Sequence, residues 1–139
     1  KLDAQISNSI SKLDGMTLVC GKYEGVDERV IKHYNMIEIS VGDYILSGGD
    51  LAAMVLIDSV VRCLPNVLGN PMTLNEESFT NHLLEYPLYT KPREWKNYKV
   101  PDVLLSGDHK KIKNWKIKQS EDITMKRRPD LWKKYLKLK

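Results

Sequence analysis

The sequence predicts an α/β domain with a mainly parallel sheet, followed by a small and mostly helical second domain. Helical and strand-like patterns alternate over residues 1–68, which is typical of a parallel sheet covered by helices. A stretch with Gly69 and Pro71 interrupts the alternation at 69–80, and we interpret it as the linker between the domains. Residues 81–139 then carry further helical patterns and most of the basic side chains.

The predicted first domain opens with a helix, because apolar residues recur at helical spacing from Leu2 to Leu13. Two segments rich in apolar and β-branched residues, at 16–20 and 36–41, predict strands. Pro65 is expected to stop the last helix of the domain, since proline cannot continue a helix. The helices expected in this domain cover residues 2–13, 26–34 and 50–64.

The predicted second domain is mostly helical, although several prolines keep its first part irregular. Ser106 can cap a helix that begins near Asp108 and runs through Gln119. Asp108 suits the positive end of that helix dipole. Pro129 suits the first turn of a final helix.

Charge is distributed unevenly along the chain. Residues 1–80 hold 6 Lys and Arg against 11 Asp and Glu, a net charge of −5. Residues 81–139 hold 16 Lys and Arg against 7 Asp and Glu, a net charge of +9. This division predicts two domains with different partners, and the basic one favours a nucleic-acid surface. A solvated, lysine-rich helix surface is the alternative.

Other classes of protein find little support in the composition. No apolar run approaches the ~18 residues that a membrane helix needs. The cysteines, Cys20 and Cys63, show neither a metal-ligand spacing nor a disulfide framework, and their apolar contexts predict that both are buried. We therefore expect no zinc site, assign no metal-ligating residues, and expect a reducing, cytoplasmic environment.

The most informative stretch is the glycine-rich junction at 42–53, which joins the second predicted strand to the next helix. Glycines 42, 48 and 49 let the backbone turn sharply and approach a ligand closely. Backbone N–H and C=O groups at such a junction are available to that ligand. A simple turn is the alternative, and the spacing of a dinucleotide-binding fingerprint is absent.

A second block, Cys20–Arg29, follows the first predicted strand, and the two blocks together resemble the bacterial tRNA (guanine-N1)-methyltransferase family, TrmD, of the SPOUT superfamily. Motifs in the C-terminal half match the same family in the same order. These motifs are Ser106-Gly107-Asp108-His109, Ile112, Trp115-Lys116, Gln119-Ser120 and Arg127-Arg128-Pro129-Asp130-Leu131. The resemblance covers nearly the whole chain.

This resemblance implies a SPOUT-type fold, a parallel sheet with a trefoil knot, present here in part and followed by a small helical domain. It implies methyl transfer from S-adenosyl-L-methionine to N1 of the tRNA guanine just 3′ of the anticodon, guanine-37. Family members work as homodimers whose active sites are shared between subunits, and they are reported to need Mg²⁺. The family's first strands and helices are expected before Lys1, so a protein of only these residues is expected to be unstable or inactive by itself.

The resemblance also assigns binding residues. Cofactor contacts fall on the two glycine-containing loops, whose bare backbone can hold a flat adenine; core packing is the alternative for Tyr44 and Leu46. The matching residues are Gly21, Tyr23, Glu24, Val41, Gly42, Asp43, Tyr44, Ile45, Leu46, Gly48 and Gly49. The residues assigned to RNA are Ser106, His109, Lys116, Arg127 and Arg128. Trp115 and Trp132 can also stack on bases, but their helical spacing favours packing in the core.

Two residues match the family's catalytic positions. Arg62 lies in a mostly apolar helical run and would stabilise negative charge on the guanine O6; a salt bridge to Asp58 is the alternative. Glu77 matches the position at which the family has an Asp that acts as the catalytic base, and Glu77 would therefore take the N1 proton. Its neighbour Glu76 competes for that role, and a solvated acidic pair is the alternative for both.

Two other functions remain open from the sequence. The first is a different SPOUT enzyme, such as a ribose 2′-O-methyltransferase or a ribosomal RNA methyltransferase. The second is a non-catalytic RNA-binding module. A test of cofactor binding distinguishes the RNA-binding module from either enzyme. The position of the methyl group on the RNA distinguishes the two kinds of enzyme.

Overall fold

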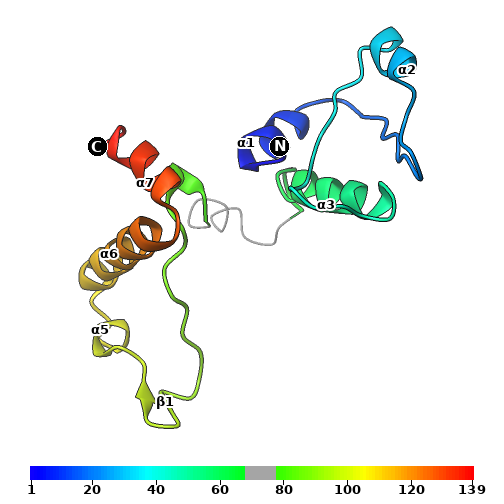
Figure 1. Cartoon of the computed structure of the whole chain (residues 1–139). Coiled ribbons are helices and arrows are strands. Elements are labelled where there is room, and N and C mark those ends of the chain that lie inside the picture. The colour runs from blue at the N-terminus through cyan, green and yellow to red at the C-terminus, as the bar shows by residue number, and fades with distance from the viewer. Residues whose placement is uncertain (68–77) are drawn as a thin grey trace. The chain divides into compact units, whose positions relative to one another are not determined.

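The computed structural model describes residues 1–67 and 78–139 of the chain. The chain forms two compact units, Lys1–Pro71 and Met72–Lys139 (Figure 1). Each unit has its own buried residues, and each is described below by itself. Of the residues singled out in the sequence, Gly69, Pro71, Glu76 and Glu77 lie outside the described part.

The N-terminal unit contains three helices, α1 (Ala4–Ile10), α2 (Glu28–His33) and α3 (Asp50–Val61). They correspond to the three predicted helices, and each is shorter than predicted. Aspartates cap the first two helices: the Asp3 carboxylate accepts from Ile6 N at 2.8 Å, and the Asp27 carboxylate accepts from Arg29 N. These caps fix where the first two helices begin.

The core of this unit lies between α1 and α3, which pack side by side (Figure 1). Leu56 and Val60 on α3 are buried, and the buried Ser7 on α1 donates a hydrogen bond to Ser59 Oγ at 3.1 Å. The interface is thus closed by apolar contacts and one hydroxyl pair. It holds the helix that follows the glycine-rich junction.

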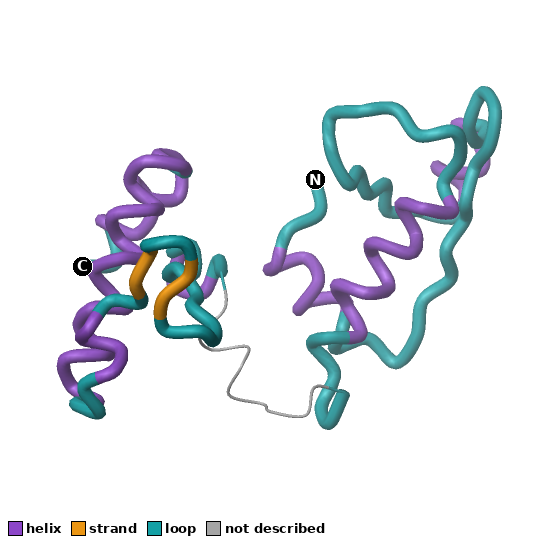
Figure 2. Tube along the Cα trace, turned by 90° about the horizontal axis from the view of Figure 1, so that it is seen from below, coloured by secondary structure: helices purple, strands orange, loops and turns teal. Residues whose placement is uncertain are grey.

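The predicted strands at 16–20 and 36–41 are wrong for this structure. Figure 2 shows both segments as loop, and the described part of the N-terminal unit contains only one isolated β-bridge, between Lys22 and Gly48. A strand requires a neighbour that takes up its backbone hydrogen bonds, and no described segment runs alongside these two as a ladder. Their side chains are exposed accordingly, with Val19 at 57% and Ile37 at 86%. Cys20, expected to be buried, is also exposed.

The described part of the C-terminal unit, from residue 78 onward, opens with an irregular segment that leads to a hairpin. A 3₁₀ turn, η1 (Thr80–His82), precedes the antiparallel strands β1 (Glu94–Trp95) and β2 (Tyr98–Lys99). Glu94 pairs with Lys99 and Trp95 with Tyr98. The turn residues, Lys96 and Asn97, both have positive φ, which is the backbone of the tight hairpin turn. The sequence analysis did not predict this hairpin.

Three helices complete the unit: α5 (Asp102–Leu105), α6 (His109–Arg127) and α7 (Pro129–Leu136). The N-cap of α6 is Asp108, whose carboxylate accepts from the backbone N–H groups of Lys110 and Lys111. The prediction that Ser106 caps this helix is therefore wrong: Ser106 closes α5, and its Oγ accepts from Asp108 N at 3.2 Å. The prediction of Pro129 in the first turn of the last helix is confirmed.

The C-terminal unit is held together around α6. Thr124 on α6 is fully buried, and its Oγ1 donates to Ser120 O at 2.6 Å and accepts from Leu84 N at 2.8 Å. On α7, Tyr135 donates to Glu121 Oε1 at 2.6 Å, and this contact ties α7 to α6. No helix in the described ranges is long and apolar enough to cross a membrane.

Candidate functional site

The two glycine-containing loops of the N-terminal unit meet backbone to backbone. Gly49 N donates to Gly21 O at 2.8 Å, and Lys22 and Gly48 form the isolated bridge beside it. A Cβ atom added to Gly49 would lie 3.0 Å from Cys20 Cα and 3.2 Å from Gly21 N. Only glycine therefore allows this close approach without a shift of the backbone.

A hollow of about 280 Å³ opens where the loops meet. Eight of the eleven residues assigned to the cofactor line this hollow. They are Gly21, Tyr23, Val41, Gly42, Tyr44, Leu46, Gly48 and Gly49. The lining also includes residues that the sequence analysis missed, among them the hydroxyl-bearing Ser40 and Ser47. Their only sequence signal was their position next to the matched residues.

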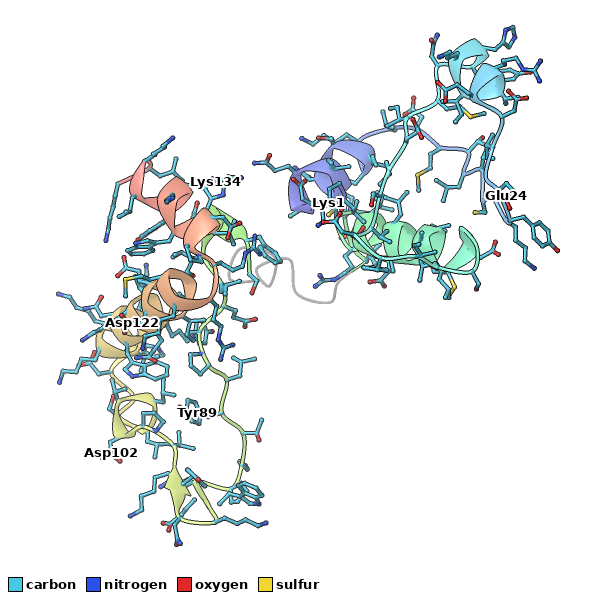
Figure 3. The ribbon with its side chains drawn as sticks, in the orientation of Figure 1. Lys1, Glu24, Tyr89, Asp102, Asp122 and Lys134 are labelled. Carbon is cyan, nitrogen blue, oxygen red and sulfur yellow. The ribbon has the colours of Figure 1, made fainter. Side chains whose placement is uncertain are left out.

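Three of the assigned residues do not line the hollow. Ile45 is 99% exposed, and the Asp43 carboxylate pairs with Lys1 Nζ at 3.1 Å. Glu24 lies on the exposed loop before α2, where Figure 3 labels it. The structure therefore brings the backbone-rich part of the set together and leaves these three side chains outside it.

The walls of the hollow combine an aromatic ring with polar backbone. The Tyr44 ring stands directly beside Gly42, so that a Cβ at Gly42 would collide with it. Ser40 Oγ donates to Gly42 O at 3.1 Å and accepts from Gly42 N at 3.2 Å, which fixes the turn between them. A flat apolar ring and exposed peptide groups are the features that can hold a heterocyclic ligand by its face and edges.

Arg62 lies at the opposite end of α3 from the glycine-rich junction. It is the C-cap residue of this 12-residue helix, is half-buried, and donates its backbone N–H to Asp58 O at 3.2 Å. A helix of that length spans about 18 Å at ~1.5 Å per residue. Arg62 does not line the hollow. Glu77 and Glu76 lie outside the described residues.

The residues assigned to RNA occupy three places on the C-terminal unit. Ser106 and His109 flank the cap of α6; both are exposed, and Ser106 Oγ donates to Val103 O at 2.7 Å. Lys116 is half-buried in the middle of α6, with Nζ 4.4 Å from the centre of the Tyr86 ring. Trp115 and Trp132, for which the sequence left base stacking and core packing as alternatives, are both half-buried.

The third place is the end of α6, where two neighbouring arginines differ. Arg127 is exposed, whereas Arg128 is half-buried and forms two hydrogen bonds with the Asp130 carboxylate. The Arg128 hydrogen bond lowers the pKa of Asp130 to about 2, and the same contact raises the pKa of Arg128. The guanidinium of Arg128 also lies 6.0 Å from the Phe79 ring. Arg128 thus has intramolecular partners that hold it in place.

The described residues of the types that commonly bind metal ions do not form a cluster. Among residues 1–67 and 78–139, no group of three or more His, Cys, Asp and Glu residues is placed to hold a metal ion.

Comparison with known proteins gives one consistent result. The family model described as tRNA (Guanine-1)-methyltransferase TrmD matches residues 1–134. A tRNA (guanine-N(1)-)-methyltransferase of Pelagibacter ubique is 58% identical over 137 residues, which is 99% of this chain and 60% of that protein. Proteins of the same name from a Ruegeria species and Wolbachia pipientis are 52% and 51% identical over 97% and 94% of this chain, and 55% and 56% of their own lengths. The chain thus spans little more than half the length of these curated relatives.

Proposed function

Since the chain belongs to the tRNA (guanine-1)-methyltransferase TrmD family, we propose that the protein transfers a methyl group from S-adenosyl-L-methionine to N1 of a tRNA guanine. The target is the guanine just 3′ of the anticodon, guanine-37. The observation that carries this proposal is the family match across residues 1–134, which includes both glycine-containing loops and the basic helices. The relatives that share the sequence over nearly its whole length bear the name of this activity.

The hollow between the two loops is the proposed cofactor site. Its volume of about 280 Å³ is close to the lower end of small-molecule sites, roughly 300–1,000 Å³. The close packing at Gly49 supports the fit, because it brings the two glycine-containing loops together at the hollow. When bound, S-adenosyl-L-methionine supplies an electrophilic methyl group. Gly21, Gly48 and Tyr44 would hold the adenosyl part by its edges and face.

Two side chains are proposed to act on the guanine. Glu77 would accept the N1 proton, and Arg62 would stabilise the negative charge that develops on O6. Support for both roles comes from the resemblance of the sequence to the family at these two positions, which lie within the span 1–134 that the family model matches. In this proposal the active site is completed in a homodimer, with the C-terminal domain of one subunit serving the cofactor site of its partner. A need for Mg²⁺ has the family resemblance as its only support.

The C-terminal unit is the proposed tRNA-binding domain. A net charge of +9 in residues 81–139 suits the phosphate backbone, and Ser106, His109, Lys116, Arg127 and Arg128 are the proposed contacts. We divide the chain into a cofactor-binding part at 1–68, a linker at 69–80 and the tRNA-binding domain. A trefoil knot in the first part and a cytoplasmic location belong to the same proposal.

The proposal is tested by incubating the purified protein with unmodified tRNA and methyl-labelled S-adenosyl-L-methionine. Label in the tRNA supports it. Calorimetry with S-adenosylhomocysteine on the same sample separates the alternatives. Cofactor binding with transfer to another RNA indicates a different methyltransferase. RNA binding without any cofactor binding indicates a non-catalytic RNA-binding module.

A further inference from the structure

A second hollow, of about 400 Å³, lies within the C-terminal unit between α6 and the segment at 84–88. Its apolar lining comes from Leu84, Pro87 and Ile123. Two charged residues of opposite sign, Glu85 and Arg127, line it as well. The volume of the hollow lies within the range of small-ligand sites, roughly 300–1,000 Å³.

The wall of this hollow is fixed to α6 before any ligand arrives. Leu84 N donates to Oγ1 of the fully buried Thr124 at 2.8 Å, and Glu85 N donates to Ser78 Oγ at 2.9 Å. Both bonds take up backbone N–H groups of the segment that carries Glu85. Because the backbone is held at two successive residues, a ligand would meet a preorganised wall.

The charged groups of the hollow are available to a ligand. Over the described residues, the Glu85 carboxylate and the Arg127 guanidinium form no ion pair and no hydrogen bond. Arg127 differs in this respect from its neighbour Arg128, which is held by Asp130. An acceptor, a cation and an apolar surface thus meet in one place.

We propose that this hollow binds one unstacked guanine of the RNA substrate. Guanine offers two adjacent donors, N1–H and N2–H, on its Watson–Crick edge, and a carboxylate can accept from both. Adenine places an acceptor at N1, so a carboxylate there opposes it. The apolar lining receives the base, Glu85 reads its edge, and Arg127 pairs with the adjoining phosphate. The inference rests on the proposed function in one respect, that RNA is the substrate.

Binding of short single-stranded RNAs that differ only in one central base tests the inference. We expect the intact protein to prefer guanine over adenine by roughly 5- to 150-fold, the range for one good two-point base contact. Glu85→Gln should lower the preference by about that factor, leaving only what the proposed catalytic site contributes, and Glu85→Asp should keep part of it because the carboxylate remains. Arg127→Ala should weaken the binding of both RNAs by the same factor. Glu94→Gln and Lys126→Ala are matched controls outside the hollow.

Equal binding of the two RNAs by the unmodified protein overturns the inference, as does a full guanine preference in Glu85→Gln. Circular dichroism of each variant checks that it is folded. If Glu85→Gln does not fold, the Glu85→Asp variant still decides the test. Failure of the proposed function looks different: methyl transfer would be absent while the guanine preference and its loss in Glu85→Gln were still measured.

Discussion

Arg128 and Asp130 hold each other through a two-point contact: Nε donates to Oδ1 at 2.9 Å, and Nη2 donates to Oδ2 at 2.6 Å. The pair spans the corner between α6 and α7, since Arg128 is the residue between the helices and Asp130 lies in the first turn of α7. Such forked contacts have defined geometry as well as charge. Arg128 must release Asp130 before it can bind a phosphate in the same way, whereas Arg127 forms no such pair with any residue that the structure describes.

This difference predicts unequal effects on RNA binding. Arg127→Ala should reduce the slope of log affinity against log salt by about 0.7–0.9, the value for one phosphate contact. Arg128→Ala should change the slope by less, because its charge is already partly neutralised by Asp130. The measurement is tRNA affinity over a series of salt concentrations. Equal slopes for the two variants would contradict the assignment of Arg128 as the held residue.

The same contact predicts a pH dependence of stability. The pKa of Asp130 is about 2 in the folded protein and near its ordinary value of 3.8 when unfolded, so the folded state favours the ionised form. The stabilisation is therefore complete above about pH 4, and it is lost as the pH falls from 3.8 towards 2. Asp130→Asn should lower the urea midpoint above pH 4, and this effect should become small as the pH falls through 2.

Arg128→Ala is the matched control for this titration. Without the guanidinium, Asp130→Asn should change the pH dependence of the urea midpoint much less, because the largest cause of the lowered pKa is gone and only weaker backbone hydrogen bonds remain. A pH-dependent effect of Asp130→Asn that survives in full in the Arg128→Ala background would assign the shift to another group.

The close approach at Gly49 makes a prediction about the cofactor site. Gly49→Ala places a Cβ 3.0 Å from Cys20 Cα, and such overpacking costs about 1–3 kcal/mol. The shift it forces should weaken S-adenosylhomocysteine binding in calorimetry. Gly15→Ala is the control, because its Cβ would meet nothing within 4 Å and Gly15 does not line the hollow. Equal affinities in both folded variants would move the site away from these loops.

The sequence predicted the helices better than the strands. Apolar periodicity and a proline in a first turn depend on local geometry, and both predictions are confirmed, the first by α1 and the second by Pro129 at the start of α7. Strands depend on neighbours, and residues 16–20 and 36–41 find none in the described chain. The hairpin at Glu94–Lys99 was missed because its turn, Lys96-Asn97, lacks the glycine that usually marks such turns.

In the candidate site too, the sequence predicted features that depend on local backbone and missed those that depend on contacts made by folding. The loop glycines that meet at the hollow carried a backbone signal in the sequence, namely glycines at a predicted junction. The difference between Arg127 and Arg128 carried none, because it arises from a contact to Asp130 across a helix corner. The second hollow was invisible for the same reason: Glu85 and Arg127 are far apart in sequence and meet only through folding.

The proposed catalytic roles predict rate effects without loss of cofactor binding. Glu77→Gln should slow single-turnover methylation by ~10²–10⁴-fold, and Arg62→Ala by about 10²–10³-fold. Glu77→Asp should retain activity because it restores the family's residue, and Glu76→Gln is the control. If Glu76→Gln abolishes turnover and Glu77→Gln does not, the base is the neighbouring carboxylate. If neither change matters, the proton leaves by another route.

The position of the transferred methyl group tests the central claim most directly. A tRNA with guanine just 3′ of its anticodon is incubated with the protein and labelled S-adenosyl-L-methionine, and the digested nucleosides are mapped to their positions. We predict 1-methylguanosine at that position, and no label when the guanine is replaced by adenine. Label on a ribose 2′-oxygen, or a methyl group at any other tRNA position, would contradict the account.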